Sequence, residues 1–217
     1  MLSHAALAEL AGRSYIGPWS GRAALDCEYD LLPREGELIV VMPGTNPADP
    51  LDWIRDMSVA PCWLEGVGPV HEGFGRGGEA LFARIARTVK GDPRPLTIIG
   101  HSLGGALGQI VAALIAARLP STAFGLVTFG APRAGFLNPW FARLVRSGVH
   151  AVEYRRRGDI VPDLPSAPPF NHPTSPRNIG TPVALTPGLD EVGRLERAIC
   201  DNHASAAYAA DLAALKL

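Results

Sequence analysis

The stretch that decides the fold is LTIIGHSLGGALGQIVAALIAARL, residues 96–119. Its first five residues form a near-continuous apolar run, which is typical of a strand covered on both faces of a parallel sheet. The residues from Leu103 to Leu119 are rich in Ala and Leu and stop at Pro120, as a buried helix would. Between the two lies Gly100-x-Ser102-x-Gly104, the pattern of a serine at a tight strand-to-helix turn with minimal side chains around it. We therefore expect Ser102 to present a reactive hydroxyl.

Strand and helix patterns alternate on both sides of this stretch. Further strands are predicted at Leu25–Leu32, Leu38–Met42, Phe124–Gly130 and Ala151–Arg155. Helical patterns occupy Leu81–Val89, the residues after the Asn138-Pro139 cap, and about Ala204–Leu215. This alternation predicts an α/β protein with a mostly parallel sheet.

Length and composition favour one globular domain over residues 1–217. The chain is 47% hydrophobic and 19% charged, and its net charge of −1 gives no electrostatic reason to bind nucleic acid or an anionic membrane. Three widely spaced cysteines argue against a disulfide framework or a cysteine-based metal site. Two Pro- and Gly-rich regions, 43–78 and 162–187, interrupt the alternation, and we expect long covering or binding loops there.

A serine nucleophile needs a base, and the chain offers His150, His172 and His203 after Ser102. His150 lies between a helix end and a strand start, where a structural role is expected. His172 lies in the proline-rich region and is a candidate substrate contact. His203 directly precedes the final helix in a short polar turn, from which an imidazole can reach the carboxyl edge of the sheet. We predict His203 as the base.

The base needs a carboxylate to orient it, and two aspartates compete for this role. Asp159 follows the strand that ends near Arg155, and functional groups of open α/β sheets gather at the carboxyl ends of strands. Asp163 lies four residues further along the chain. The position at the strand exit favours Asp159, with Asp163 as the alternative.

An oxyanion hole requires two donors. The N–H of Leu103, the residue after the nucleophile, is one candidate. Thr45 is the other, because it follows the strand Leu38–Met42 in the turn Pro43-Gly44-Thr45.

Several blocks of the sequence together resemble the class 3, fungal-type triacylglycerol lipases of the α/β-hydrolase superfamily. The matching blocks are GT at 44–45, DWIRD at 52–56, VHEGF at 70–74, GHSLGGA at 100–106, TFGAPR at 128–133 and GDIVP at 158–162. The resemblance implies an α/β-hydrolase fold, a Ser102–Asp159–His203 triad, and an oxyanion hole from Thr45 and Leu103. It also implies a short lid segment over about 46–57, so Trp53 and Ile54 are candidate lid or substrate contacts.

These observations predict a carboxylic-ester hydrolase that forms an acyl-enzyme and needs neither cofactor nor metal. An acylglycerol lipase, in transient contact with a lipid interface, is the first expectation. Because the lid-like segment is rich in charged residues and proline, a soluble short-chain esterase or thioesterase is the alternative, followed by a non-catalytic binding module. No signal-peptide pattern stands at residues 1–12, from which a cytoplasmic location is expected. The pattern does not fix the oligomeric state.

Overall fold

The computed structural model describes residues 2–16, 19–22, 27–44, 60–183 and 191–217. Within these residues a sheet of seven strands runs through the middle of the molecule in the order β1-β2-β3-β6-β7-β9-β11. The strands β3, β6, β7, β9 and β11 pair in parallel, and β1 and β2 are antiparallel. Their bounds are β1 Gly21–Arg22, β2 Glu28–Arg34, β3 Glu37–Met42, β6 Leu96–His101, β7 Phe124–Phe129, β9 His150–Arg156 and β11 Arg177–Ile179. The expected α/β class with a mostly parallel sheet is confirmed.

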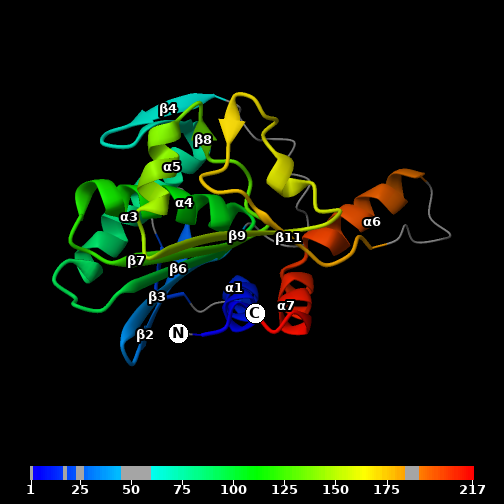
Figure 1. The fold of residues 1–217 in the computed structure, drawn as a ribbon, viewed down its shortest axis with the longest axis horizontal. Coiled ribbons are helices and arrows are strands. Elements are labelled where there is room, and N and C mark those ends of the chain that lie inside the picture. Colours follow the sequence, from blue (N-terminus) through cyan, green and yellow to red (C-terminus); the bar gives the residue numbers. More distant parts are fainter. Residues whose placement is uncertain (1, 17–18, 23–26, 45–59, 184–190) are drawn as a thin grey trace.

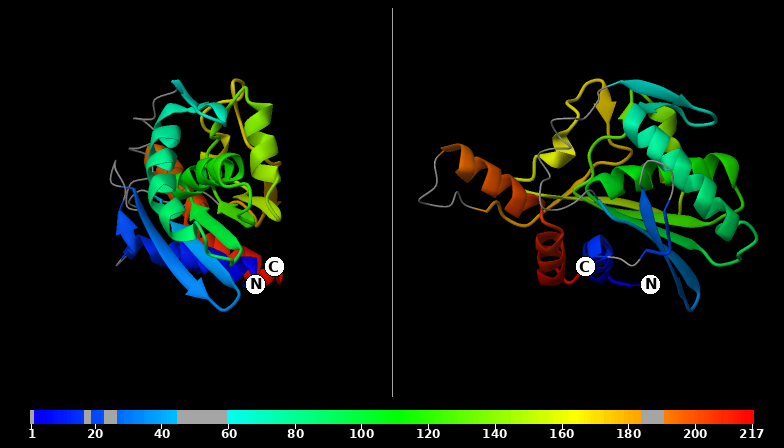
Figure 2. Two further views of the ribbon diagram at one scale, coloured as in Figure 1. Left: turned by 90° about the vertical axis from the view of Figure 1, so that its left-hand side faces the viewer. Right: turned by 180° about the vertical axis from the view of Figure 1, so that it is seen from behind.

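Helices cover both faces of this sheet (Figure 1). One face carries α3 (Glu72–Val89), α4 (Leu103–Arg118) and α5 (Pro139–Arg146), while α1 (His4–Arg13) and α7 (Ser205–Ala214) cover the other. The two views of Figure 2 show the same layers, with α6 (Glu191–His203) projecting beyond the sheet. The two chain ends meet where the Ala5 N–H donates to the Leu217 carbonyl at 3.0 Å.

The sequence explains why the central elements form. Strands β3, β6 and β7 are almost entirely buried apolar runs, which suits strands covered on both faces. Helix α4 is buried continuously from Gly104 to Ile115, so its apolar character on all sides fits its central place. Helix α5 begins where the Asn138 side chain accepts a hydrogen bond from the Phe141 N–H at 3.0 Å, with Pro139 in the first turn, as predicted.

The expectation of a long loop over 43–78 is wrong for its described part. The segment after residue 59 forms the hairpin of β4 (Pro61–Leu64) and β5 (Gly68–His71), and α3 begins at Glu72 rather than near Leu81. The hairpin joins β8 (Gly135–Phe136) and β10 (Phe170–Asn171) in a four-stranded antiparallel sheet. Strands this short leave little periodic pattern to read.

The sequence does not predict the first half of α3, because this part contains several glycines and glycine disfavours a helix in isolation. Close packing explains them here. A Cβ at Gly75 would lie 2.6 Å from the Cys62 sulfur, and a Cβ at Gly78 would lie 2.5 Å from Ile110 of α4. The helix therefore approaches β4 and α4 at a distance that larger residues would prevent.

The C-terminal region also differs from the expectation. His203 is the last residue of α6 instead of part of a short turn, and Ala204 alone separates α6 from α7. Within the proline-rich region the chain forms the short helix η3 (Val161–Asp163) and the strands β10 and β11. Among the described residues, none of the helices has the length and apolar character needed to cross a bilayer.

Candidate active site

Ser102 stands at the turn between β6 and α4 in a strained backbone conformation. Its φ of 56° and ψ of −129° lie where non-glycine residues are rare. The flanking glycines allow the turn to close: a Cβ on Gly100 would overlap the Gly104 carbonyl, and a Cβ on Gly104 would overlap the Met42 carbonyl. The turn predicted from the Gly-x-Ser-x-Gly pattern is present, and it aims the serine side chain away from the sheet.

Three side chains far apart in the sequence meet at this turn. His203 Nε2 lies 2.8 Å from Ser102 Oγ, and His203 Nδ1 lies 2.9 Å from Asp159 Oδ2. All three are buried, at 3% exposure for Ser102, 4% for His203 and 1% for Asp159. Because a carboxylate only accepts, Nδ1 carries the proton toward Asp159, and Nε2 of the neutral ring is left to accept the Ser102 hydroxyl proton.

Asp159 is fixed by two further donors. The Tyr208 hydroxyl donates to Oδ2 at 2.6 Å, and the Val161 N–H donates to Oδ1 at 2.9 Å. Burial, with the Asp159 charge as a second cause, raises the pKa of Tyr208 well above its ordinary value, so the phenol keeps the proton that it donates. The Tyr208 oxygen also accepts from the Arg156 N–H at 2.9 Å. Tyr208 had no distinguishing signal in the sequence, where it is one aromatic residue in an alanine-rich helix.

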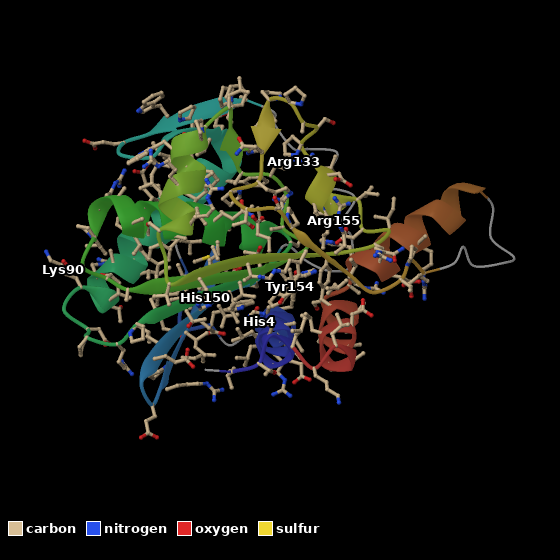
Figure 3. The ribbon with its side chains drawn as sticks, in the orientation of Figure 1. His4, Lys90, Arg133, His150, Tyr154 and Arg155 are labelled. Atoms are coloured by element: carbon tan, nitrogen blue, oxygen red, sulfur yellow. The ribbon has the colours of Figure 1, made fainter. Side chains whose placement is uncertain are left out.

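Asp163, the alternative acid, pairs with two arginines. Its carboxylate binds Arg155 through two bonds of 2.7 and 2.9 Å and Arg133 at 3.2 Å. Figure 3 shows Arg133 and Arg155 beside η3. The hydrogen bond from Arg155 is the main cause that lowers the pKa of Asp163. Of the two aspartates, the structure brings Asp159 to the histidine.

The other predicted site residues have different outcomes. Leu103 is the first residue of α4, where helix N–H groups lack intrahelical acceptors and the helix dipole is positive. Thr45, Trp53 and Ile54 lie outside the described residues.

His172 has both ring nitrogens occupied, by Glu153 Oε2 at 2.8 Å and by the Pro162 carbonyl at 2.7 Å. Its imidazole therefore has no nitrogen left for the substrate contact that the sequence suggested.

His172 belongs to a buried network around Glu153, which the sequence analysis missed. Glu153 is 2% exposed and accepts from Gln109 of α4 at 2.8 Å as well as from the N–H and hydroxyl of Thr174. His172 links Glu153 to the Pro162 carbonyl in η3. Pro162 directly follows Val161, whose N–H donates to Asp159. The network ties the acid-bearing turn to β9 and α4.

Replacing Tyr208 by Phe is expected to lower kcat/KM for ester hydrolysis about tenfold, corresponding to about 1.4 kcal/mol. The variant removes one charge-assisted bond from Asp159 but leaves the bonds from His203 and Val161. Steady-state kinetics beside a urea unfolding curve measures both effects. An unchanged kcat/KM would show that the Tyr208 bond serves stability alone.

A known protein family matches the region that carries Ser102 and Asp159. A family model described as Lipase (class 3) matches residues 39–168, which contain most of the strand β3, the Ser102 turn and Asp159. The chain belongs to the class 3 lipase family. The resemblance inferred from the sequence blocks is confirmed.

The curated relatives of this member of the class 3 lipase family include fungal proteins. The secreted mono- and diacylglycerol lipase MDL2 of Malassezia globosa is 31% identical over 178 residues, which cover 71% of this chain and 57% of the relative. The secreted mono- and diacylglycerol lipase 1 of Fusarium solani is 34% identical over 123 residues, covering 52% and 35%. The chain thus spans about a third to somewhat over half the length of the relatives it matches. The expected cytoplasmic location is wrong, because these relatives are named as secreted proteins.

Solved lipase structures share the fold of this chain. The triacylglyceride lipase of Rhizomucor miehei superposes with a TM-score of 0.63 at 25% identity, covering 80% of this chain and 77% of that one. A triacylglycerol lipase whose catalytic centre is described as a serine protease triad gives 0.61 at 26% identity, covering 73% and 63%. The α/β-hydrolase fold expected from the resemblance is confirmed.

Proposed function

We propose that this chain is a serine carboxylic-ester hydrolase that acts on acylglycerols through an acyl-enzyme. The observation that carries the proposal is a continuous row of three side chains. Ser102 Oγ lies within hydrogen-bond distance of His203 Nε2, and His203 Nδ1 lies within hydrogen-bond distance of Asp159 Oδ2. In this proposal residues 1–217 act as one domain. Membership of the class 3 lipase family supports the same reaction.

The first half of the reaction makes the acyl-enzyme. His203 Nε2 takes the Ser102 proton while Oγ attacks the ester carbonyl, and the carbonyl oxygen becomes an oxyanion. The Leu103 N–H at the positive end of α4 and the Thr45 N–H are the proposed donors to that oxygen. The C–O bond to the alcohol then breaks, and His203 returns its proton to the leaving alkoxide.

The second half regenerates the enzyme. Water gives a proton to His203 and attacks the acyl carbonyl, and collapse of the second tetrahedral intermediate releases the acid and restores the Ser102 hydroxyl. During both halves Asp159 faces a charged imidazolium. Its buried carboxylate, held by Tyr208 and Val161, stabilises that charge without moving.

The substrate class rests on the relatives. The curated relatives are named as lipases of mono- and diacylglycerols, which supports acylglycerols as substrates and transient contact with a lipid interface. A soluble short-chain esterase or thioesterase uses the same row of residues and is the second candidate. The intact row argues against a non-catalytic binding module on this fold.

The substrate class is tested by hydrolysis of p-nitrophenyl esters of increasing acyl length beside mono-, di- and triacylglycerol emulsions. We expect turnover of acylglycerols, with a rate that rises as the substrate passes its solubility limit. Rates confined to short, dissolved esters would assign the chain to the second candidate. Absence of turnover for every ester, with a correctly folded protein, would reject the hydrolase proposal.

A further inference from the structure

His101, the residue before the nucleophile, is a buried histidine whose protonation can be assigned. Its Nε2 lies 2.7 Å from the main-chain carbonyl oxygen of His203, and a carbonyl can only accept, so Nε2 carries a proton. Burial and the neighbouring His203 lower the pKa of His101 well below its ordinary value, so the ring is neutral and Nδ1 is unprotonated. Tyr15, whose hydroxyl lies 2.6 Å from Nδ1, must therefore be the donor of that bond.

The Tyr15 hydroxyl also touches the strand end that leads to the proposed oxyanion residue. Burial is the main cause that raises the pKa of Tyr15. A Cβ on Gly44 would collide with the Tyr15 hydroxyl and would lie 3.0 Å from both the His101 carbonyl oxygen and Ser102 Cβ. Gly44, directly before Thr45, is thus packed between Tyr15 and the nucleophile turn.

On its other side His101 holds the catalytic histidine in two ways. His203 ends α6, and the carbonyls of a last helical turn lack intrahelical donors, so the His101 Nε2–H satisfies an acceptor that would otherwise be unpaired. The two imidazole rings also lie against each other, with centroids 4.7 Å apart and planes tilted by 33°. His101 therefore contacts both the backbone and the ring face of His203.

We propose that Tyr15 and His101 are positioning residues: their hydrogen bonds hold the nucleophile turn and the catalytic histidine together, and the Tyr15 hydroxyl packs against Gly44 beside the proposed oxyanion residue. The hydrogen bonds run from the Tyr15 O–H to His101 Nδ1 and from His101 Nε2–H to the His203 carbonyl, and Gly44 packs against the Tyr15 hydroxyl. These hydrogen bonds connect the N-terminal region of the polypeptide to its C-terminal region, since Tyr15 lies in η1 (Ser14–Ile16) and His203 in α6. This inference rests on the proposed function.

The donor-to-acceptor order of these hydrogen bonds explains why the Tyr15 hydroxyl matters for the proposed catalysis. Without it, Nδ1 is a buried acceptor with no donor, and the ring can bring Nδ1 to another donor only by turning. Turning moves Nε2–H away from the His203 carbonyl and breaks the hydrogen bond there. A small displacement of His203 is costly because proton transfer from Ser102 depends on the present alignment.

Tyr15→Phe is the direct test, and the molecule supplies a matched control. The Tyr154 hydroxyl also lies 2.6 Å from a histidine nitrogen, His4 Nδ1, the same distance as between Tyr15 and His101, and the rings again meet edge to face. Figure 3 shows His4 and Tyr154 together at the sheet face covered by α1. We expect Tyr15→Phe to lower kcat about tenfold at unchanged KM, because alignment acts on the transition state. Tyr154→Phe should keep kcat within about twofold.

Two further variants separate positioning from packing. His101→Gln retains an N–H donor near the position of Nε2 and should keep more of kcat than His101→Leu, which has no donor. Equal kcat in Tyr15→Phe and Tyr154→Phe, or a change confined to KM, would overturn the proposal. Equal kcat in the two His101 variants would overturn it as well.

A readout independent of turnover distinguishes failure of this inference from failure of the proposed function. NMR of ¹⁵N-histidine-labelled protein should show His101 as the neutral Nε2–H tautomer, and the His203 Nδ1–H signal should shift in Tyr15→Phe but not in Tyr154→Phe. An Nδ1–H tautomer at His101, or the same His203 spectrum in both variants, overturns the inference. Inactivity of the unchanged protein toward all esters, with these signals as expected, rejects only the proposed function.

Discussion

Ser102→Ala is expected to lower kcat/KM for ester hydrolysis by about 10⁴-fold or more, because the acyl-enzyme cannot form without the Oγ nucleophile. The loss should fall on kcat, since the substituted atom acts in the bond-making step. Alanine keeps the Cβ and the same backbone constraint at φ 56°, so the strain of the turn is unchanged. The free energy of unfolding of the variant should therefore lie within about 1 kcal/mol of that of the original protein. Single-turnover kinetics and denaturant unfolding measure the two quantities.

A fluorophosphonate probe gives a second measurement of the Ser102 prediction. The unchanged protein should be labelled once, at Ser102, and Ser102→Ala should not be labelled. Ser147→Ala is the control, because the Ser147 hydroxyl donates to the Leu144 carbonyl at the end of α5 and is not part of the Ser102–His203–Asp159 row. Retention of half the original rate in Ser102→Ala, or labelling at another serine, would contradict the assignment of the nucleophile.

The parts of the fold that the sequence predicts are those whose physical cause is local. Strands β3, β6 and β7 are continuous apolar runs with both faces covered, so their composition alone predicts that they are buried. The turn at Ser102 needs small residues at fixed offsets, because Gly100 and Gly104 approach other backbone carbonyls. Both signals can be read within a few residues.

The parts that the sequence does not predict depend on distant partners. The glycines that open α3 are tolerated because Cys62 and Ile110 pack against them, and neither partner is visible from the helix itself. Tyr208 meets Asp159 across 49 positions, and Tyr15 meets His101 across 86. A tyrosine hydroxyl has no spacing rule that marks it as a partner of a catalytic residue, so only the folded chain identifies it.

Asp159→Asn is expected to lower kcat by about 10⁴-fold, whereas Asp163→Asn should change it by less than about threefold. The amide group that Asp159→Asn introduces can donate to His203 Nδ1, which places the ring proton on Nε2, opposite the Ser102 hydroxyl. His203 can then no longer accept the serine proton. Asp163 contacts arginines instead, and its side chain is 47% exposed, so its ion pairs are screened by solvent.

Asp163→Asn should also change how the stability of the protein depends on pH. The pKa of Asp163 is lowered by Arg155, so its carboxylate stabilises the folded state above the ordinary carboxyl pKa of about 4 and loses that contribution as pH falls through the lowered value. Asp163→Asn should remove part of the acid destabilisation while leaving kcat at neutral pH nearly intact. Denaturant unfolding from pH 3 to 7, beside kinetics at pH 7, tests both statements. A larger loss of kcat in Asp163→Asn than in Asp159→Asn would exchange the roles of the two residues, against the 2.9 Å contact between Asp159 and His203.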